Sequence, residues 1–205
     1  MKTLIAIPAM DYVRTEFCGS LAALRKPEES EVVIVQNSLV HAARNQVVWK
    51  AIEGNFDAIL WIDSDMTFQP DAAERLIADA ERGYAYISAL CFSRKLPTAP
   101  VIYKSLTWSE TDNEAISYFE YPKNAIFEVA ASGAAFCLVK TDLYKLVMDE
   151  FRTGPYEPLP RFGEDLSLCW RLQQIGVKMY CDSSVKVGHV GTLVFDESVW
   201  ESQTS

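Results

Sequence analysis

Ile59-Leu60-Trp61-Ile62-Asp63-Ser64-Asp65-Met66 is an apolar run that ends in two acidic residues with one serine between them. The stretch Ala58–Ile62 has the length and composition of a buried strand. Two carboxylates at a strand end, inside a cleft, require a counter-charge. A hard divalent cation with oxygen ligands, Mg²⁺ or Mn²⁺, supplies it, usually shared with substrate phosphates. The alternative is a solvated surface turn, and the strand-end position makes the cation site an equally good interpretation.

The first half of the chain alternates strands with helices around this stretch. The apolar runs that predict strands are Leu4–Ile7, Glu31–Val35, Ala58–Ile62 and Tyr84–Leu90. The predicted helices are Tyr12–Leu24, a helix that Asn37 or Ser38 caps and Gly54 ends, and a helix that Pro70 opens and Gly83 stops. This alternation predicts an α/β fold with a Rossmann-like, mostly parallel central sheet flanked by helices. Ligands bind such sheets at the carboxyl ends of the strands, where Asp63 and Asp65 lie.

The second half of the chain is less regular. Residues 92–125 hold prolines and aromatic residues and predict an excursion with short strands. The further predicted elements are a strand at Phe136–Val139, helices over 141–151 and Glu164–Ile175, and short strands at Val177–Cys181 and Val185–Val187. The chain from about residue 192 predicts a weakly structured tail. Because no repeat or linker interrupts the pattern, we expect residues 1–205 to form a single domain.

The composition limits the partners and the compartment. The 205 residues carry a net charge of −9, and 49% hydrophobic with 23% charged residues is an ordinary globular composition. An acidic surface repels phosphate backbones, which argues against a nucleic-acid partner. The net charge does not exclude a local basic patch inside a cleft. The five cysteines form no CxxC pair, the N-terminal apolar run is short, and no apolar stretch reaches about 18 residues. We therefore expect a cytoplasmic protein with reduced thiols and no membrane span.

Two further motifs carry candidate chemistry. Gly163-Glu164-Asp165 lies at the start of an amphipathic helix. Acids at a helix start are good caps and dipole partners, but Asp165 can also be a general base that Glu164 orients. Gly188-His189 follows a predicted strand and is flanked by another glycine, so His189 is free to reach a ligand or to lie solvated in a loop.

In their order along the chain, these motifs resemble the GT-A-fold glycosyltransferases of the family-2 type. The matching segments are Ile5–Pro8, Ala42–Asn45, Trp61–Met66, Ala131–Phe136, Gly163–Asp165 with Cys169 and Arg171, and Gly188-His189. The resemblance covers roughly residues 3–191. Each motif is weak alone, and their order makes the match specific. The resemblance implies a GT-A fold and an enzyme that transfers a sugar from a nucleotide-diphosphate donor to an acceptor hydroxyl.

The resemblance also implies a UDP- or GDP-sugar donor, a divalent metal (Mn²⁺ or Mg²⁺) and a role for each motif. Asp65 would bind the metal at the donor diphosphate, Asp63 would contact the ribose or join the metal site, and His189 would be a further metal ligand. Asp165 would deprotonate the acceptor in an inverting transfer, and Glu164 would position it or touch the acceptor. The other implied donor-site residues are Pro8, Ala9 and Met10, which would line the base pocket, Ser64, and Arg44, which would face the nucleotide.

One position departs from the family pattern. Members often carry an acid at the end of the second strand that reads the nucleotide base, whereas Val35 is followed here by Gln36 and Asn37. Amides can still pair with a base edge, but uracil becomes a less secure expectation. The acceptor stays open among a glycan, a protein, a small molecule and a modified nucleobase, and the acidic charge argues only against the last.

Three other functions fit parts of the pattern. Asp63-Ser64-Asp65-Met66-Thr67 also matches the opening motif of haloacid-dehalogenase-type phosphatases, with Asp63 as nucleophile and Asp65 as acid/base. That motif normally ends the first strand, whereas here it ends the third. A sugar nucleotidyltransferase would need a Gly-rich N-terminal loop followed by lysine, which this chain lacks. The third alternative is a non-catalytic protein that binds a sugar nucleotide.

Overall fold

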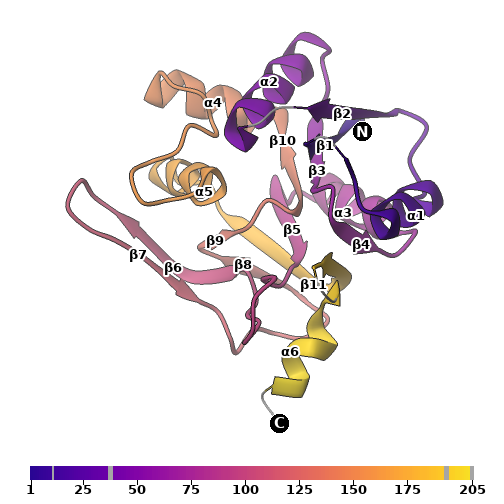
Figure 1. Cartoon of the computed structure of the whole chain (residues 1–205). Coiled ribbons are helices and arrows are strands. Elements are labelled where there is room, and N and C mark those ends of the chain that lie inside the picture. Colours follow the sequence, from indigo (N-terminus) through magenta and orange to yellow (C-terminus); the bar gives the residue numbers. More distant parts are fainter. Residues whose placement is uncertain (11, 37–38, 192–193, 204–205) are drawn as a thin grey trace.

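A central sheet of nine strands runs through the part of the chain that the structure describes (Figure 1). The computed structural model describes residues 1–205 except 11, 37–38, 192–193 and 204–205. In order across the sheet the strands are β12 (Val194–Phe195), β11 (Met179–Val190), β5 (Tyr86–Leu90), β10 (Phe136–Lys140), β3 (Ala58–Ile62), β1 (Thr3–Ala9) and β2 (Ser30–Gln36). Strands β4 (Met66–Phe68) and β8 (Ile126–Val129) pair with β11 outside this row.

Five of the seven strands in this row, all except β10 and β12, run in the same direction. β1 pairs in parallel with both β2 and β3, and β11 pairs in parallel with β5. β10 is inserted antiparallel between β3 and β5. This arrangement confirms the expected α/β class with a mostly parallel central sheet.

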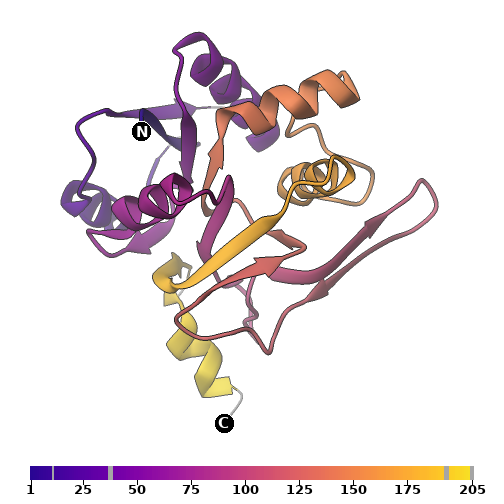
Figure 2. The ribbon, with the colours of Figure 1, turned by 180° about the vertical axis from the view of Figure 1, so that it is seen from behind.

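Helices flank both faces of this sheet. They are α1 (Thr15–Ala23), α2 (Val40–Glu53), α3 (Ala72–Glu81), α4 (Thr141–Phe151) and α5 (Glu164–Gln174), whereas α6 (Glu197–Gln203) follows β12 and lies away from the faces of the sheet. Val47 of α2, Val147 of α4 and Leu168 of α5 share one hydrophobic core. Phe17 of α1 and Leu76 of α3 belong to a second core. The view from behind shows α1 and α3 on one side of the sheet and α4 and α5 on the other (Figure 2).

Strand β3, which precedes Asp63, contributes side chains to both hydrophobic cores. Ile59 and Trp61 point into the core under α2, α4 and α5, whereas Leu60 and Ile62 point into the core under α1 and α3. All five residues of β3 are fully buried. Successive side chains of a strand face opposite sides, so a strand covered on both faces is apolar throughout. Because β3 is buried on both faces, the position of its carboxyl end, and of Asp63 directly after it, is fixed.

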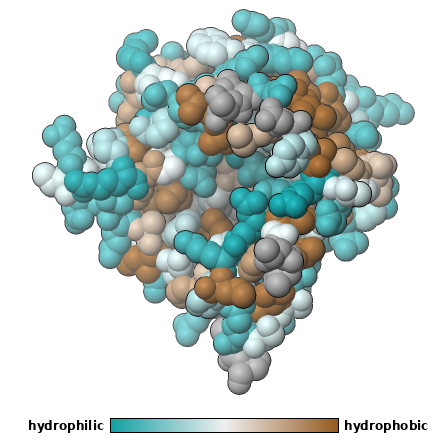
Figure 3. All heavy atoms as spheres, in the orientation of Figure 1, coloured by the Kyte–Doolittle hydropathy of each residue, from teal (hydrophilic) through white to brown (hydrophobic). Residues whose placement is uncertain are grey.

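A second, smaller sheet is formed by the excursion that the sequence predicted. Its order is β7 (Asn113–Ser117), β6 (Ile102–Trp108) and β9 (Ala131–Ser132). The β6–β7 hairpin projects from the molecule, and its tip carries hydrophilic side chains (Figure 3). Trp108 on β6 packs edge-on against Trp170 of α5, with ring centroids 5.2 Å apart, and this contact joins the hairpin to the main body.

Two predicted strand limits differ from the structure. Pro8 does not end β1, which continues to Ala9 in register with Gln36. The pairing of β1 with β3 stops at Ala6, so the N–H that Pro8 lacks is not needed on that side. The two short strands expected at 177–181 and 185–187 form one strand, β11, whose register against β5 shifts between Asp182 and Lys186. The proposed caps at residues 37 and 38 lie outside the described residues.

The tail is not weakly structured, because β12 and α6 lie within it. Glu197 at the start of α6 forms ion pairs with Lys123 and Lys186. Trp200 stacks on Phe119 with ring centroids 5.5 Å apart. These partners are distant in sequence, which is why no local pattern predicted the helix. Among the described helices, none combines the length and apolarity needed to cross a membrane.

Candidate active site

Asp63, Ser64 and Asp65 form the connection between β3 and β4 at the carboxyl end of β3. The Asp63 backbone N–H donates to the Ala135 carbonyl at 2.8 Å, and the Met66 N–H donates back to the Asp63 carbonyl at 3.2 Å. A short turn therefore carries both carboxylates at the edge of the sheet where ligands bind in α/β proteins. The sequence predicted this location from the strand pattern alone.

Arg44 of α2 joins Asp63 to Glu164. Its Nη2 donates to Asp63 Oδ1 at 2.8 Å and its Nε to Glu164 Oε1 at 3.3 Å, while Nη1 lies 3.5 Å from the Ala134 carbonyl oxygen. The Arg44 side chain is only 2% exposed. Burial raises the pKa of Asp63, and the charge of Arg44 opposes that rise. The guanidinium thus connects the acidic motif after β3 with the acidic motif that starts α5.

Two aromatic rings form cation–π contacts with Arg44. Its guanidinium carbon lies 5.0 Å from the Trp61 ring centroid and 5.6 Å from that of Tyr156. Trp61 Nε1 donates to the Tyr144 hydroxyl at 2.8 Å, and that hydroxyl lies 3.0 Å from the hydroxyl of Tyr156. Cation–π contacts gain strength when they are desolvated. The burial of Arg44 and its two carboxylate partners give it a supporting position, and its expected role toward the nucleotide stays a prediction.

Asp165 lies in the first turn of α5 beside this ionic group. Its Oδ1 accepts a hydrogen bond from the Leu166 N–H at 2.7 Å. Burial, and then the charge of Glu164, raises the pKa of Asp165 to about 6, against the opposing effects of the Leu166 N–H and Arg44. The sequence predicted that the helix start would stabilise the anion, but burial outweighs that effect. A carboxyl group with this pKa is ionised at pH 7 and is a stronger base than an ordinary aspartate.

Gly163 makes room for the Asp165 carboxylate, and Gly133 lies beside it. A Cβ atom at Gly163 would lie 2.9 Å from Asp165 Oδ1, and a Cβ atom at Gly133 would lie 3.6 Å from Asp165 Oδ2. The Gly133 N–H also donates to the Val101 carbonyl at 3.0 Å, which ties the glycine to the smaller sheet. Gly133 belongs to a segment that resembles the family, but only the structure reveals that it lies beside Asp165.

Asp65 contacts two nitrogen-bearing side chains, those of His189 and Arg94, and the sequence predicted only His189 at this site. His189 Nε2 lies 3.3 Å from Asp65 Oδ1, and Arg94 Nη1 lies 2.5 Å from Asp65 Oδ2. Burial would raise the pKa of Asp65, but the hydrogen bond from His189 and the charges of His189 and Arg94 lower it below its usual value. Arg94 lies four residues after Leu90, the last residue of β5. The carboxyl end of that strand was the signal that could have identified it.

His189 lies within strand β11, opposite Met66 of β4, and not in the loop that its glycine neighbours suggested. Its Nδ1 is 3.0 Å from the Phe92 carbonyl oxygen. A carbonyl oxygen only accepts, so Nδ1 carries the hydrogen. Nε2 then either carries a second proton or presents a lone pair toward Asp65, and the latter arrangement suits a metal ion between them.

The two side chains that can hold a divalent cation are therefore Asp65 and His189. Asp63, the third expected ligand, has one oxygen on Arg44, and its side chain is 30% exposed. No group of three or more histidine, cysteine, aspartate or glutamate side chains that could hold a metal was found among the described residues. One carboxylate and one imidazole still fit a cation that takes its other ligands from water and a bound diphosphate.

A cavity of about 260 Å³ borders this group. It is lined by Pro8, Ala9, Met10, Val40, Ala43, Asp63, Ser64, Asp65 and Arg94. Every residue that the sequence assigned to the donor, except the buried Arg44, lines this one cavity. The expected base-pocket residues at the end of β1 thus lie beside the acidic motif after β3.

The loop at residues 152–162 packs against Asn45, which follows Arg44 in α2. Asn45 Oδ1 accepts a hydrogen bond from the Tyr156 N–H at 2.9 Å, and a Cβ atom at Gly154 would lie 2.6 Å from the Asn45 amide nitrogen. The Ser167 hydroxyl accepts a hydrogen bond from the Leu159 N–H at 2.8 Å. Asn45 follows Arg44 in the segment that resembles the family, and the structure gives it this anchoring contact.

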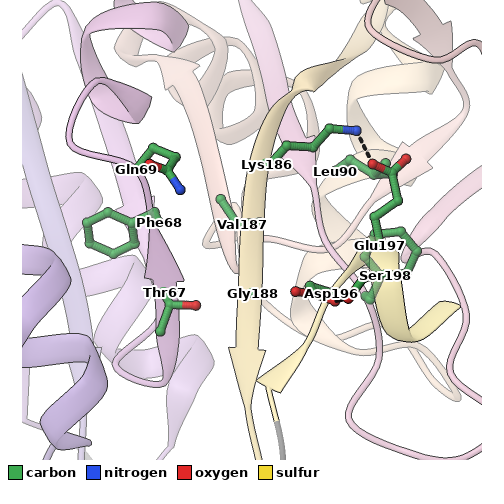
Figure 4. A pocket seen from close by; sticks show the side chains of 11 residues that line it. Thr67, Phe68, Gln69, Leu90, Lys186, Val187, Gly188, Asp196, Glu197 and Ser198 are labelled. Atoms are coloured by element: carbon green, nitrogen blue, oxygen red, sulfur yellow. Dashed lines mark hydrogen bonds and ion pairs between the residues drawn. The ribbon is translucent and has the colours of Figure 1, made fainter. Parts of the chain in front are cut away.

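A second cavity, of about 310 Å³, lies where α6 meets β4 and β11 (Figure 4). Lys186 and Glu197 form an ion pair across it, and Thr67 and Gly188 border it. A Cβ atom at Gly188 would clash with Thr67, so glycine is required for this close approach. None of the predicted site residues lines this cavity, and the candidate active site is therefore the smaller cavity beside Asp65.

Comparisons with known proteins give a fold relationship. The chain matches no family model and no curated protein sequence. Among solved structures it is similar to A197 from STIV, with 20% sequence identity and a TM-score of 0.63. The similarity covers 93% of this chain and 86% of that chain. The two proteins therefore share an α/β architecture over nearly their whole lengths.

Proposed function

We propose that the protein is a metal-dependent glycosyltransferase with a GT-A fold of the family-2 type, which transfers a sugar from a UDP- or GDP-sugar to an acceptor hydroxyl. One observation carries the proposal. Arg44 donates hydrogen bonds to both Asp63 and Glu164 and so links the acidic motif after β3 to the start of α5, where Asp165 has a pKa raised to about 6. A solvated turn and an ordinary helix cap would not need this buried connection.

The donor half of the proposal rests on the cavity of about 260 Å³. Pro8, Ala9 and Met10 in its lining would contact the nucleotide base. Asp65, which also lines it, and His189, which contacts Asp65, would hold Mn²⁺ or Mg²⁺. The cation supplies positive charge to the diphosphate that leaves when the glycosidic bond breaks.

The acceptor half of the proposal rests on Asp165. Its carboxylate would take the proton from the acceptor hydroxyl while that oxygen bonds to the anomeric carbon and the bond to the diphosphate oxygen breaks. General base catalysis of this kind contributes about 10²–10⁴-fold. Glu164, fixed by Arg44, raises the pKa of Asp165 by its charge and so strengthens the base.

A donor screen tests the proposal. The purified protein is incubated with UDP- and GDP-sugars, with Mn²⁺ or with EDTA, and the released nucleoside diphosphate is measured. We expect release from at least one donor that requires Mn²⁺ and is lost in Asp65→Asn, because a charged ligand becomes a neutral amide. Asp142→Asn is the matched control, since the Asp142 side chain is 86% exposed and lies outside the cavity.

Two results would contradict the proposal. Full activity after exhaustive EDTA treatment would remove the metal from it. Phosphate release from phosphomonoesters, with a phosphoryl group trapped on Asp63, would instead establish the phosphatase alternative.

A further inference from the structure

Arg94 and Arg44 are bound to neighbouring acidic residues in very different ways. The Arg94 side chain is 46% exposed, whereas that of Arg44 is 2% exposed. Within the described residues, Arg94 makes a single ion pair, to Asp65. Arg44 contacts two carboxylates and two aromatic rings. The Arg94 side chain is therefore free to exchange its partner, whereas Arg44 is not.

The backbone that carries Arg94 is fixed. The Ser93 N–H donates to the Ala99 carbonyl at 2.9 Å, and the Thr98 hydroxyl donates to the Ser93 carbonyl at 2.6 Å. The Thr98 N–H donates to the Gln203 side chain of α6 at 2.7 Å. A long side chain on a fixed backbone reaches a limited set of positions, and Arg94 lines the proposed donor cavity.

Asp65 cannot satisfy Arg94 and a divalent cation equally well. Arg94 contacts Asp65 Oδ2, and His189 contacts Oδ1. A divalent cation at this carboxylate would repel the guanidinium. Arg94 lines the cavity, where a donor diphosphate would offer two or more acceptor oxygens. Guanidinium groups bind such oxygens in bidentate geometry, with charge-assisted hydrogen bonds.

We propose that Arg94 is a mobile diphosphate-binding residue, which neutralises Asp65 in the free protein and turns to the donor diphosphate when a divalent cation binds at Asp65. This inference rests on the proposed function and adds to it a residue that stabilises the leaving group. It also couples the two ligands. Arg94 opposes the cation when no diphosphate is present and favours the diphosphate once the cation is bound, so each ligand strengthens the binding of the other.

Arg94→Gln tests the exchange, because glutamine removes the charge and keeps a polar side chain. Binding of Mn²⁺ alone is measured by the loss of the free-ion EPR signal, and binding of UDP and GDP at saturating Mn²⁺ by calorimetry. We expect Arg94→Gln to bind Mn²⁺ alone about 3–10-fold more tightly and to bind the nucleoside diphosphate about 10-fold or more weakly. Arg25→Gln is the matched control, since Arg25 pairs with Glu74 on the surface.

The opposite signs of the two changes distinguish an exchanging residue from a structural one. If Arg94→Gln weakens both ligands, or changes neither while the wild-type protein binds both, the inference is overturned and the proposed function stands. If the wild-type protein binds neither Mn²⁺ nor UDP or GDP, the proposed function and this inference both fail. Thermal unfolding of Arg94→Gln, compared with wild type, shows whether the variant is folded.

Discussion

The ionic group around Arg44 and the ionic group around Asp65 lie on either side of one short turn, but they differ in burial. Arg44, Asp63 and Glu164 meet over the Trp61 ring, with the arginine withdrawn from solvent. Asp65, His189 and Arg94 meet at the rim of the cavity, where the arginine is half-exposed. A buried charge that loses its partner is costly, whereas an exposed pair contributes little. We therefore infer that the group around Arg44 stabilises the fold, whereas the group around Asp65 can exchange its ion-pair partners for ligands.

The largest expected effect comes from removing Arg44. Arg44→Met leaves Asp63 and Glu164 without their shared cation, and we expect a loss of about 3–5 kcal/mol in the free energy of unfolding. Arg94→Met should cost less than about 1 kcal/mol, because exposed ion pairs are weak. Urea denaturation of both variants measures the difference. Equal losses in the two variants would contradict the distinction between scaffold and exchangeable pair.

Asp165→Asn should separate activity from stability. It removes the proton acceptor, so we expect kcat to fall by about 10²-fold or more while donor affinity changes by less than a few-fold. The folded pKa of about 6, against an ordinary 3.8, means that ionised Asp165 destabilises the fold at pH 7 by up to about 3 kcal/mol. The variant should therefore unfold at a temperature several degrees higher. A collapse of donor affinity with an unchanged kcat would instead make Asp165 a binding residue.

The pH dependence follows from the same carboxyl group. Because the base must be ionised, kcat/KM should rise about tenfold per pH unit below about pH 6 and level off above it. The stability has the opposite sign. A folded pKa raised above the unfolded value means that the folded state binds the proton more tightly, so the contribution of Asp165 to stability falls as the pH rises from about 4 to about 6. Initial rates and melting temperatures between about pH 4 and pH 8 measure both trends, with Asp165→Asn as the reference that lacks this titration.

The smallest expected effect concerns α6. Trp200 lies near Phe92, with ring centroids 6.5 Å apart, and the Phe92 carbonyl accepts the hydrogen bond that orients His189. Trp200→Ala should weaken Mn²⁺ binding by about 2–5-fold, because second contacts of metal-binding histidines tune affinity. Trp200→Phe keeps an aromatic ring and should restore most of the affinity. An alanine variant with wild-type Mn²⁺ affinity would show that α6 does not position His189.

Local sequence patterns determined most of the framework. The run Ala58–Ile62 matches β3 residue for residue, and the strand and helix predicted at 136–151 closely match β10 and α4. The acids at 164 and 165 lie at the start of α5, as their position before an amphipathic stretch predicted. Burial on both faces of a strand and the apolar stripe of a helix are written into consecutive residues, so a short window of sequence is enough to detect them.

Only the tertiary structure decided which charges meet. Arg44 reaches Glu164 across 120 residues, and Arg94 reaches Asp65 across 29 residues. The sequence identified both acids and Arg44, but it did not predict the carboxylate and aromatic partners of Arg44 and did not identify Arg94. The helix α6 was missed for the same reason, since Lys123, Lys186 and Phe119 hold it from distant segments. The energy of an ion pair depends on burial and on the distance between the two groups, and both are set by the packing of the whole chain.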